Sequence, residues 1–384
     1  MKIRKIIYYL LLLILSVGCR EKYIPDIPNS QKGILVVEGF INLGTGPTII
    51  QLTRSAGLDS AYLSFETGAR LEVQTEGGAS FPLTEQGRGK YTIDQVPLMA
   101  SERYRLHILT SNGRNYLSDL SEVNMTPPID SVNWKMNGDQ VAIFVSTHDP
   151  QNKTSYYQWQ FEETWQYTAM YQSQLTYTGN SVISRPIEEQ IFNCWRSDNS
   201  NTILISSSAD LTEDVISQFP VTEVPVLTTD KLVLRYSILV KQYGLSKDWY
   251  EWIQKVKKNT EQLGSLFDPQ PSGTGGNIHS VSDPDEMVIG WVGCTTETDK
   301  RIFIDHKEVP GSYPHGYPVT CALDIVDYDS AAIVRALSIP GRLPVEYIRS
   351  MFSSDIIGIT VSSSFCADCN LQGGSSVKPV FWQE

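Results

Sequence analysis

The stretch ILVVEGFI, Ile34–Ile41, is dense in β-branched residues and predicts a β-strand. Three further stretches alternate apolar and polar side chains: TIIQLTR (Thr48–Arg54), RLEVQT (Arg70–Thr75) and YRLHIL (Tyr104–Leu109). A period of two is typical of strands that turn one face toward a core. Short strands at this spacing predict an immunoglobulin-like or fibronectin-like β-sandwich over residues 33–126.

A larger β-rich domain is predicted over residues 127–384, because more strand patterns follow the turn signal Thr126-Pro127-Pro128. Its strands are expected at 141–147, 156–167, 202–208, 231–243, 286–292 and 301–305. The fold class predicted from the sequence is therefore mainly β, with an N-terminal sandwich followed by a larger β-rich domain.

One or two helices are expected to be inserted in the second domain. The first is predicted near residues 246–263, where Ser246 can cap the start and aromatic and aliphatic residues recur at helical spacing from Trp249 onward. A second, short helix is predicted at PVEYIRSMF, residues 344–352, because Pro344 suits a first helical turn.

The N-terminal residues 1–18 have the pattern of an export signal, with basic residues before an aliphatic run. That run is shorter than the roughly 20 residues that a membrane-spanning helix needs. Gly18 before Cys19 resembles the site at which lipoprotein signal peptides are cut, whereas a plain signal peptide that contains a cysteine is the alternative. We expect acylation of Cys19 and a lipidated tether over residues 19–32, which would attach the mature chain to a membrane, on either its surface or its periplasmic face.

Composition limits the classes of partner. The chain of 384 residues has a formal net charge of −12, and removal of residues 1–18, which contain three basic residues and no acidic one, would make the charge more negative. A strongly acidic protein repels phosphate backbones, so no nucleic-acid partner is expected.

Motifs for catalysis or for cofactor binding do not occur in the sequence, so we expect neither an enzyme nor a cofactor. The five histidines are scattered without the spacing of a zinc site, although His306 and His315 could approach each other. Two acidic runs, Asp283–Glu286 and Asp324–Asp329, offer oxygen ligands for calcium but lack an EF-hand pattern. Solvated turns are the favoured interpretation of both runs, and no metal site is predicted.

An aromatic tract from Trp159 to Tyr171 is the sharpest functional signal in the sequence. Sugar rings stack on tryptophan and tyrosine, so Trp159, Trp165 and Tyr167 are a candidate aromatic binding face. The same alternation would also place these side chains in a sandwich core, and the core interpretation is favoured.

Several segments together resemble a known family: ILVVEG soon after Cys19, RYSILVKQYGLS before an aromatic helix, KKNTEQLGSLFDPQPSGTGGNI, and the ending CADC…GG…KPVFW. Their order and spacing resemble the Bacteroidota lipoproteins classed as domain of unknown function 4249, over essentially the whole mature chain. The resemblance implies an outer-membrane lipoprotein whose gene lies near those of TonB-dependent receptors. It implies no enzymatic activity.

The same resemblance bears on the cysteines, because cysteines recur in it at positions 194, 321, 366 and 369. Two disulfides are therefore expected among Cys194, Cys321, Cys366 and Cys369, with Cys294 free and partly buried. A bridge from Cys366 to Cys369 would close too small a ring to restrain the unfolded chain. We therefore expect Cys194 and Cys321 to be the distant partners of these two residues, with the pairing between them open.

Two functions agree with these observations. The first is a non-enzymatic lipoprotein that serves as an accessory or ligand-capture partner of a TonB-dependent receptor. The second is a surface adhesin or glycan-binding lipoprotein that acts alone, with the aromatic tract as its platform.

Overall fold

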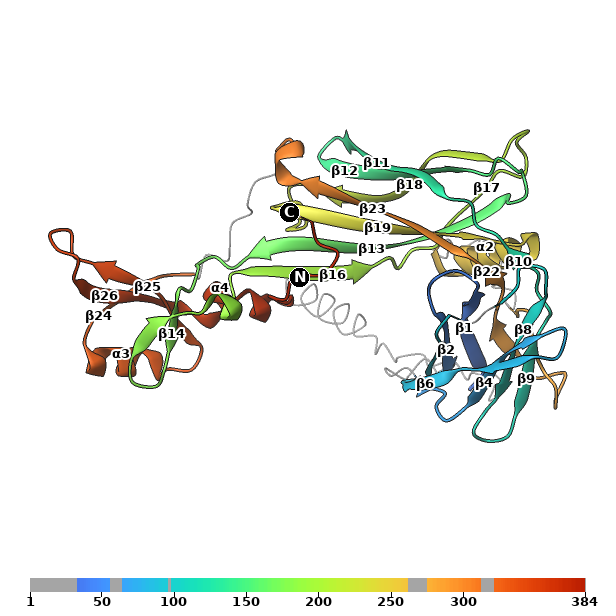
Figure 1. The fold of residues 1–384 in the computed structure, drawn as a ribbon, viewed down its shortest axis with the longest axis horizontal. Coiled ribbons are helices and arrows are strands. Elements are labelled where there is room, and N and C mark those ends of the chain that lie inside the picture. Colours follow the sequence, from blue (N-terminus) through green and yellow to red (C-terminus); the bar gives the residue numbers. More distant parts are fainter. Residues whose placement is uncertain (1–32, 56–63, 96–97, 262–274, 312–320, 384) are drawn as a thin grey trace, which may run out of the picture.

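Three bodies follow one another along the long axis of the molecule (Figure 1), and each is built mainly from β-strands. The computed structural model describes residues 33–55, 64–95, 98–261, 275–311 and 321–383. The predicted signal peptide 1–18, the tether 19–32 and Cys19 lie outside these residues. Within the described ranges, no helix has both the length and the apolar character needed to cross a bilayer.

The first body, here called the N-terminal sandwich, consists of two packed sheets. One sheet has the order β10-β22-β1-β2-β7-β6, with β21 beside β1 and β3 beside β2, and the other has the order β20-β9-β8-β4-β5. The strands that come from the first part of the chain are β1 (Leu35–Asn42), β2 (Thr48–Arg54), β3 (Ser64–Phe65), β4 (Arg70–Thr75), β5 (Ser80–Pro82), β6 (Thr84–Gly87), β7 (Lys90–Ile93), β8 (Tyr104–Leu109), β9 (Asn115–Ser118) and β10 (Val123–Asn124).

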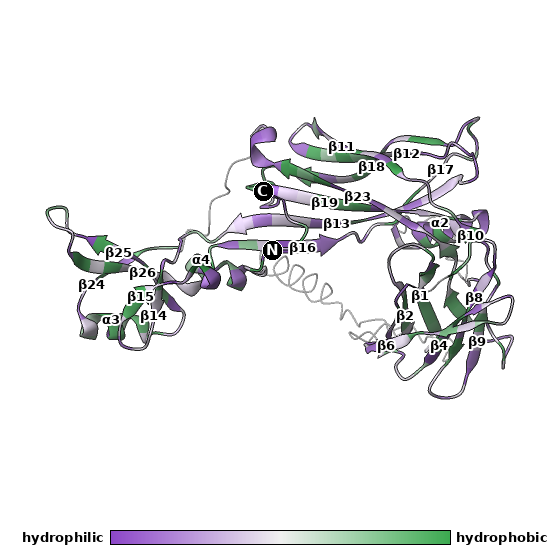
Figure 2. Cartoon of the chain, viewed as in Figure 1, coloured by the Kyte–Doolittle hydropathy of each residue, from purple (hydrophilic) through white to green (hydrophobic). Residues whose placement is uncertain are grey.

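Alternation along these strands builds the core, as the sequence predicts. In β8, Tyr104, Leu106 and Ile108 are buried, while the residues between them are only partly covered. Figure 2 shows the apolar stretches of β1 and β4 that contribute to the same core. The predicted mainly β fold with an N-terminal β-sandwich is confirmed.

The predicted range of this sandwich, residues 33–126, does not include all of its strands. A later segment returns to it and supplies β20 (Ile278–Ser280), β21 (Val288–Gly290) and β22 (Cys294–Thr295). Strands β21 and β22 lie parallel to β1, and β20 lies antiparallel to β9. The N-terminal sandwich is therefore discontinuous, because parallel pairing joins segments that are far apart in the chain.

The second body, the central sandwich, packs a three-stranded sheet on a five-stranded one. Its strands are β11 (Ile129–Asn137), β12 (Gln140–His148) and β18 (Val215–Pro225) in one sheet, and β13 (Tyr156–Thr168), β16 (Asn193–Asn199), β17 (Leu204–Ser207), β19 (Arg235–Gly244) and β23 (Glu297–Asp305) in the other. The long strand β13 pairs with β19 along ten residues and also with β16 and β17.

The helix predicted near residues 246–263 is present as α2 (Lys247–Glu261). The backbone N–H of Trp249 donates to the hydroxyl of Ser246 over 3.3 Å, as expected for a helix cap. Trp249 and Ile253 are buried in a cluster with Tyr243 and Leu245, against which Phe40 of the N-terminal sandwich also packs. Helix α2 thereby joins the first two bodies.

The third body, the distal module, is assembled from two excursions of the chain. The first supplies the hairpin β14 (Leu175–Tyr177) and β15 (Val182–Ser184), and the second supplies β24 (Asp324–Asp327), α3 (Ser330–Leu337), β25 (Arg342–Arg349) and β26 (Ile356–Ser363). Buried Ile359 and Val361 of β26 pack with Ile333 and Leu337 of α3 and with the hairpin. Short turns follow at α4 (Ser364–Ala367) and η4 (Cys369–Gln372), while η2 (Ile187–Glu189) and η3 (His306–Glu308) lie elsewhere.

Two predictions fail in this module. Residues 344–352 do not form a helix, because most of them belong to β25, which pairs with β26 from Arg342 to Arg349. A short helix lies nearby instead, namely α3, which Asp329 caps by accepting the N–H of Ala332 over 3.0 Å. The acidic run Asp324–Asp329 is thus a strand and a helix cap rather than a free turn.

Candidate interaction site on the distal module

The predicted aromatic binding face is buried in the central sandwich. The side chains of Trp159, Trp165 and Tyr167 are 0%, 4% and 5% exposed. As a binding face, this prediction is wrong, and the core interpretation of the same alternation holds.

The contacts of the two tryptophans explain their burial. Trp159 stacks on Phe219 of the opposite sheet at 4.5 Å between ring centroids, and its indole N–H donates to Gln242 over 2.9 Å. The cations of Arg196 and Lys231 lie over the ring of Trp165, at 5.7 and 5.1 Å from its centroid. No face of either ring is left for a sugar.

The cysteines pair as the sequence reasoning expects. Cys194 is bonded to Cys369, and Cys321 is bonded to Cys366, so each member of the CADC pair has a distant partner. Cys294 is free, but it is fully buried rather than partly buried, and burial raises the pKa of its thiol. The spacing of Cys366 and Cys369 therefore serves two separate structural bonds.

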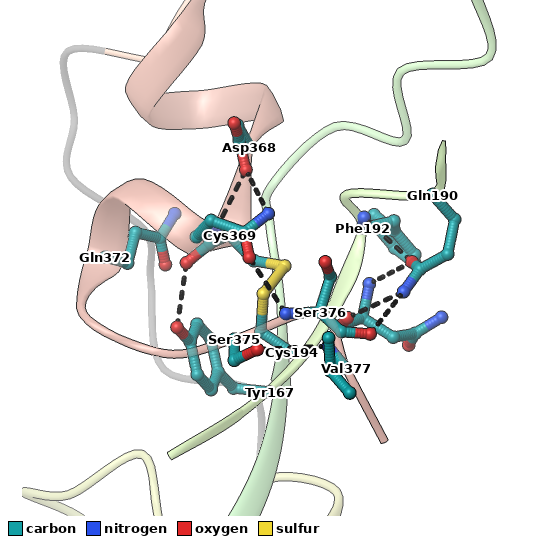
Figure 3. The surroundings of a disulfide bond; sticks show 12 residues. Tyr167, Gln190, Phe192, Cys194, Asp368, Cys369, Gln372, Ser375, Ser376 and Val377 are labelled. Carbon is teal, nitrogen blue, oxygen red and sulfur yellow. Dashed lines mark hydrogen bonds between the residues drawn. A yellow bond between two sulfur atoms is a disulfide. The ribbon is translucent and has the colours of Figure 1, made fainter. Parts of the chain in front are cut away.

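The two disulfides fix the base of the distal module, and Figure 3 shows one of them, Cys194–Cys369. Cys194 lies on β16 opposite Tyr167 of β13, and the Tyr167 hydroxyl donates to the carbonyl of Cys369 over 2.8 Å. The second disulfide joins the start and the end of the segment 321–366 that forms most of the module. The module is thus a bounded loop attached to the end of the central sandwich.

Hydrophobic side chains are exposed on this module at unusual density. Of the 23 large hydrophobic residues that are exposed in the described part of the chain, eight lie within 321–366: Leu323, Ile325, Tyr328, Ile339, Met351, Phe352, Ile357 and Phe365. Contiguous exposed apolar surface marks interaction sites in soluble proteins. The strongest case is the tip of the hairpin between β25 and β26, where Met351 and Phe352 are 92% and 96% exposed.

Hydrogen bonds within the hairpin hold this tip in a defined shape. The N–H of Ser350 donates to the carbonyl of Asp355 over 2.9 Å, and the N–H of Phe352 donates to the Ser350 hydroxyl over 3.2 Å. Arg349 donates to the carbonyl of Ser354 over 2.9 Å. Met351 and Phe352 are therefore presented to solvent by an ordered turn, which lowers the entropic cost of docking.

In the described ranges, no group of three or more His, Cys, Asp or Glu side chains is placed to hold an ion. In the acidic run Asp283–Glu286, Glu286 accepts hydrogen bonds from Arg114 over 2.5 Å and from Tyr116 over 2.8 Å. Of the two histidines predicted to approach each other, His306 lies beside Asp305 and His315 lies outside the described residues.

Comparison with known proteins assigns the sequence to a family. The family described as a domain of unknown function (DUF4249) matches residues 20–301, about three quarters of the chain. The chain belongs to this family. The DUF4249 match covers the N-terminal sandwich and reaches β23 of the central one, but it ends before Cys321 and therefore leaves out the segment 321–366. This range is shorter than the whole-chain resemblance expected from the sequence.

Solved structures similar to this DUF4249 chain include β-sandwich proteins. A segment of two fibronectin type III domains from chicken tenascin is 10% identical, with 55% of this chain and 90% of that one covered and a TM-score of 0.17. A Bacteroides uniformis protein, provisionally described as carbohydrate binding, is 11% identical, with 56% and 90% covered and a TM-score of 0.15. At these TM-scores neither likeness bears on function. No curated protein matches the sequence.

Proposed function

We propose that this chain is a non-enzymatic, lipid-anchored protein of the outer membrane that serves as an accessory or ligand-capture partner of a TonB-dependent receptor. The observation that carries the proposal is the exposed hydrophobic surface of the distal module, with Met351 and Phe352 at its tip. An ordered apolar tip of this kind is suited to insertion into a pocket of another protein.

Attachment to the membrane would use Cys19. The signal-like residues 1–18, the cysteine that follows, and the resemblance to Bacteroidota lipoproteins support acylation at this position. Several acyl chains would hold the mature protein firmly, since each buried methylene adds about 0.8 kcal/mol. Labelling with a palmitate analogue should be lost in the Cys19→Ala variant, and labelling that persists would contradict this anchor.

A non-enzymatic role agrees with the arrangement of the buried titratable groups. Glu163 accepts hydrogen bonds from Tyr236 over 2.6 Å and from Lys231 over 2.5 Å, and Tyr157 donates to Asp214 over 2.9 Å. Burial raises the pKa of both tyrosines. These hydrogen bonds hold the central sandwich together.

The partner can be tested by photo-crosslinking at the hairpin tip. A photoreactive phenylalanine derivative at position 352 of the full-length chain should yield, in native membranes, a covalent adduct with a TonB-dependent receptor. The matched control places the same group at Leu211, an exposed apolar residue of the central sandwich. A receptor that co-purifies in mild detergent but gives equal adducts at both positions would contradict the role of the tip. Absence of any associated receptor would contradict the function.

The second function predicted from the sequence, a stand-alone adhesin or glycan-binding lipoprotein, loses Trp159, Trp165 and Tyr167 as its platform because these side chains are buried. A different observation favours a glycan ligand, namely a cleft that contains Trp291 at the opposite end of the molecule.

A further inference from the structure

A cleft of about 350 Å³ opens where the N-terminal sandwich meets helix α2. Its walls come from four segments: the turn before β8, the β9–β10 connection, the start of α2, and the returning segment around β20 and β22. The lining residues used below are Arg103, Asp119, Glu122, Asp248, Asn277 and Trp291. Small-molecule sites occur preferentially at such junctions between domains, and they begin at about 300 Å³.

The walls of the cleft are fixed by buried hydrogen bonds. The side chain of Asn277, which is 2% exposed, donates to the carbonyl of Val292 and accepts its N–H, both over 2.9 Å. The carbonyl of Asn277 accepts the N–H of Asp119 over 2.8 Å. These bonds tie the two segments that carry Asp119 and Trp291 to each other, so the cleft exists before any ligand arrives.

The helix wall is fixed as well. Gly293 lies against the ring of Trp249, so closely that an added Cβ would come within 2.4 Å of it. This contact brings the first turn of α2, which carries Asp248, up to the strand segment that carries Trp291. A bulkier residue at position 293 would separate the two walls.

Trp291 gives the cleft an aromatic surface. Its side chain is only partly buried, and its ring is supported by that of Trp252, with 6.4 Å between centroids. A partly exposed indole that lines a cleft can pack against an apolar surface of a ligand, such as the C–H face of a sugar ring.

The charged groups around Trp291 decide between classes of ligand. Three carboxylates, those of Asp119, Glu122 and Asp248, line the cleft together with a single cation, Arg103. That guanidinium is already paired with Glu76. An acidic ligand would be repelled by this excess of negative charge, whereas neutral hydroxyl groups can donate hydrogen bonds to the carboxylates.

We propose that this cleft binds a neutral saccharide unit, whose apolar face packs on Trp291 while its hydroxyl groups donate to Asp248 and Asp119. The site is independent of the receptor contact, because the elements that line it lie at the opposite end of the molecule from the distal module (Figure 1). Its ligand would reach the protein whether or not a receptor is bound.

The proposal is tested by titrating the full-length protein with neutral oligosaccharides (maltotriose, mannotriose, xylotriose and cellotriose), followed by calorimetry. At least one should bind saturably, with an affinity that changes little with salt because the ligand carries no charge. Trp291→Ala should weaken binding at least about tenfold, whereas Trp291→Phe should stay within about threefold of wild type. Asp248→Ala, at an exposed residue, should weaken it about three- to tenfold.

Two controls test whether saccharide binding belongs to this cleft and follows its charge. Phe352→Ser removes an exposed aromatic residue far from the cleft and should leave saccharide binding unchanged. Trigalacturonate should bind more weakly than any neutral trisaccharide that binds. The proposal is overturned if no neutral saccharide binds, if Trp291→Ala and Asp248→Ala both bind as wild type, or if only an organic cation such as tetramethylammonium binds, with salt-sensitive affinity.

Discussion

Cys294 illustrates how burial decides the chemistry of one residue. Its thiol is enclosed in the core of the N-terminal sandwich, beside β1 and β10, and burial raises its pKa because a thiolate would lose its hydration there. A thiol that stays protonated and covered should not react with iodoacetamide in the folded protein. Mass spectrometry should detect one modified thiol, at Cys294, only after unfolding without reductant. Rapid labelling of the native protein would contradict its burial.

His148 provides a pH-dependent contact on the surface of the central sandwich. Its ring nitrogen lies 2.8 Å from a carboxylate oxygen of Asp130, and this hydrogen bond, followed by charge attraction, raises the pKa of His148 above the ordinary value of 6.5. A raised pKa in the folded state means that the contact stabilises fully below about pH 6.5 and is lost as the pH rises through the folded value. NMR titration should show this elevation in wild type and its absence in Asp130→Asn.

At the scale of residues, the sequence was a better guide to which side chains are structurally important than to which side chains are exposed to solvent. The alternation around Trp159 shows that the strand has an apolar face, but a period of two does not reveal whether that face meets solvent, a ligand or a second sheet. In the structure Trp159 packs on Phe219 of β18, which is 60 positions later in the chain. Trp291 shows the converse, since nothing in the EMVIGWV stretch distinguishes it from an ordinary strand residue.

At the scale of elements, helix α2 was predictable because its signals are local. The cap at Ser246 and the helical spacing of Trp249 and Ile253 lie within one short stretch. The segment 344–352 was predicted as a helix because Pro344 suits a first turn, yet its partner β26 makes it a strand. Tertiary pairing overrides such weak local preferences.

The disulfide Cys321–Cys366 should control the stability of the distal module more than that of its neighbours. It closes a separation of 45 residues, for which the loop-entropy estimate is about 4 kcal/mol. Only six residues form the buried core of the module, so the loss would be large in proportion. In Cys321→Ala/Cys366→Ala, amide exchange should accelerate in 321–366 while β12 and β19 keep their protection.

The companion variant Cys194→Ala/Cys369→Ala gives the matched comparison. This bond spans 175 residues and ties η4 to β16, so its estimated contribution is about 5 kcal/mol. Its removal should expose the C-terminal residues, from Cys369 onward, to exchange and proteolysis. Equal exchange patterns in the two double variants would show that the disulfides do not act on separate parts of the fold.

At the scale of the whole molecule, the sequence indicated sandwiches but not how the chain is divided among them. Residues 278–295 read as ordinary strands of the second domain, whereas their partners are β1, β9 and β10 of the first. Pairing between distant segments leaves no local mark. The division of the distal module between 175–184 and 324–363 was hidden for the same reason.

The discontinuous N-terminal sandwich leads to a prediction about fragments. The returning segment contributes Ile278, Val288 and Val292 to the core, and burial of each is worth about 1.5–3 kcal/mol. Their sum is comparable with the whole stability of a typical domain, about 5–15 kcal/mol. A fragment of residues 33–126 should therefore lack a cooperative thermal transition by circular dichroism. Joining residues 275–296 to it through a flexible linker should restore one, because β20, β21 and β22 then complete both sheets. A cooperative transition in the shorter fragment would mean that residues 33–126 form a stable sandwich without the returning strands. Residue 126 would then be the end of an independently stable domain.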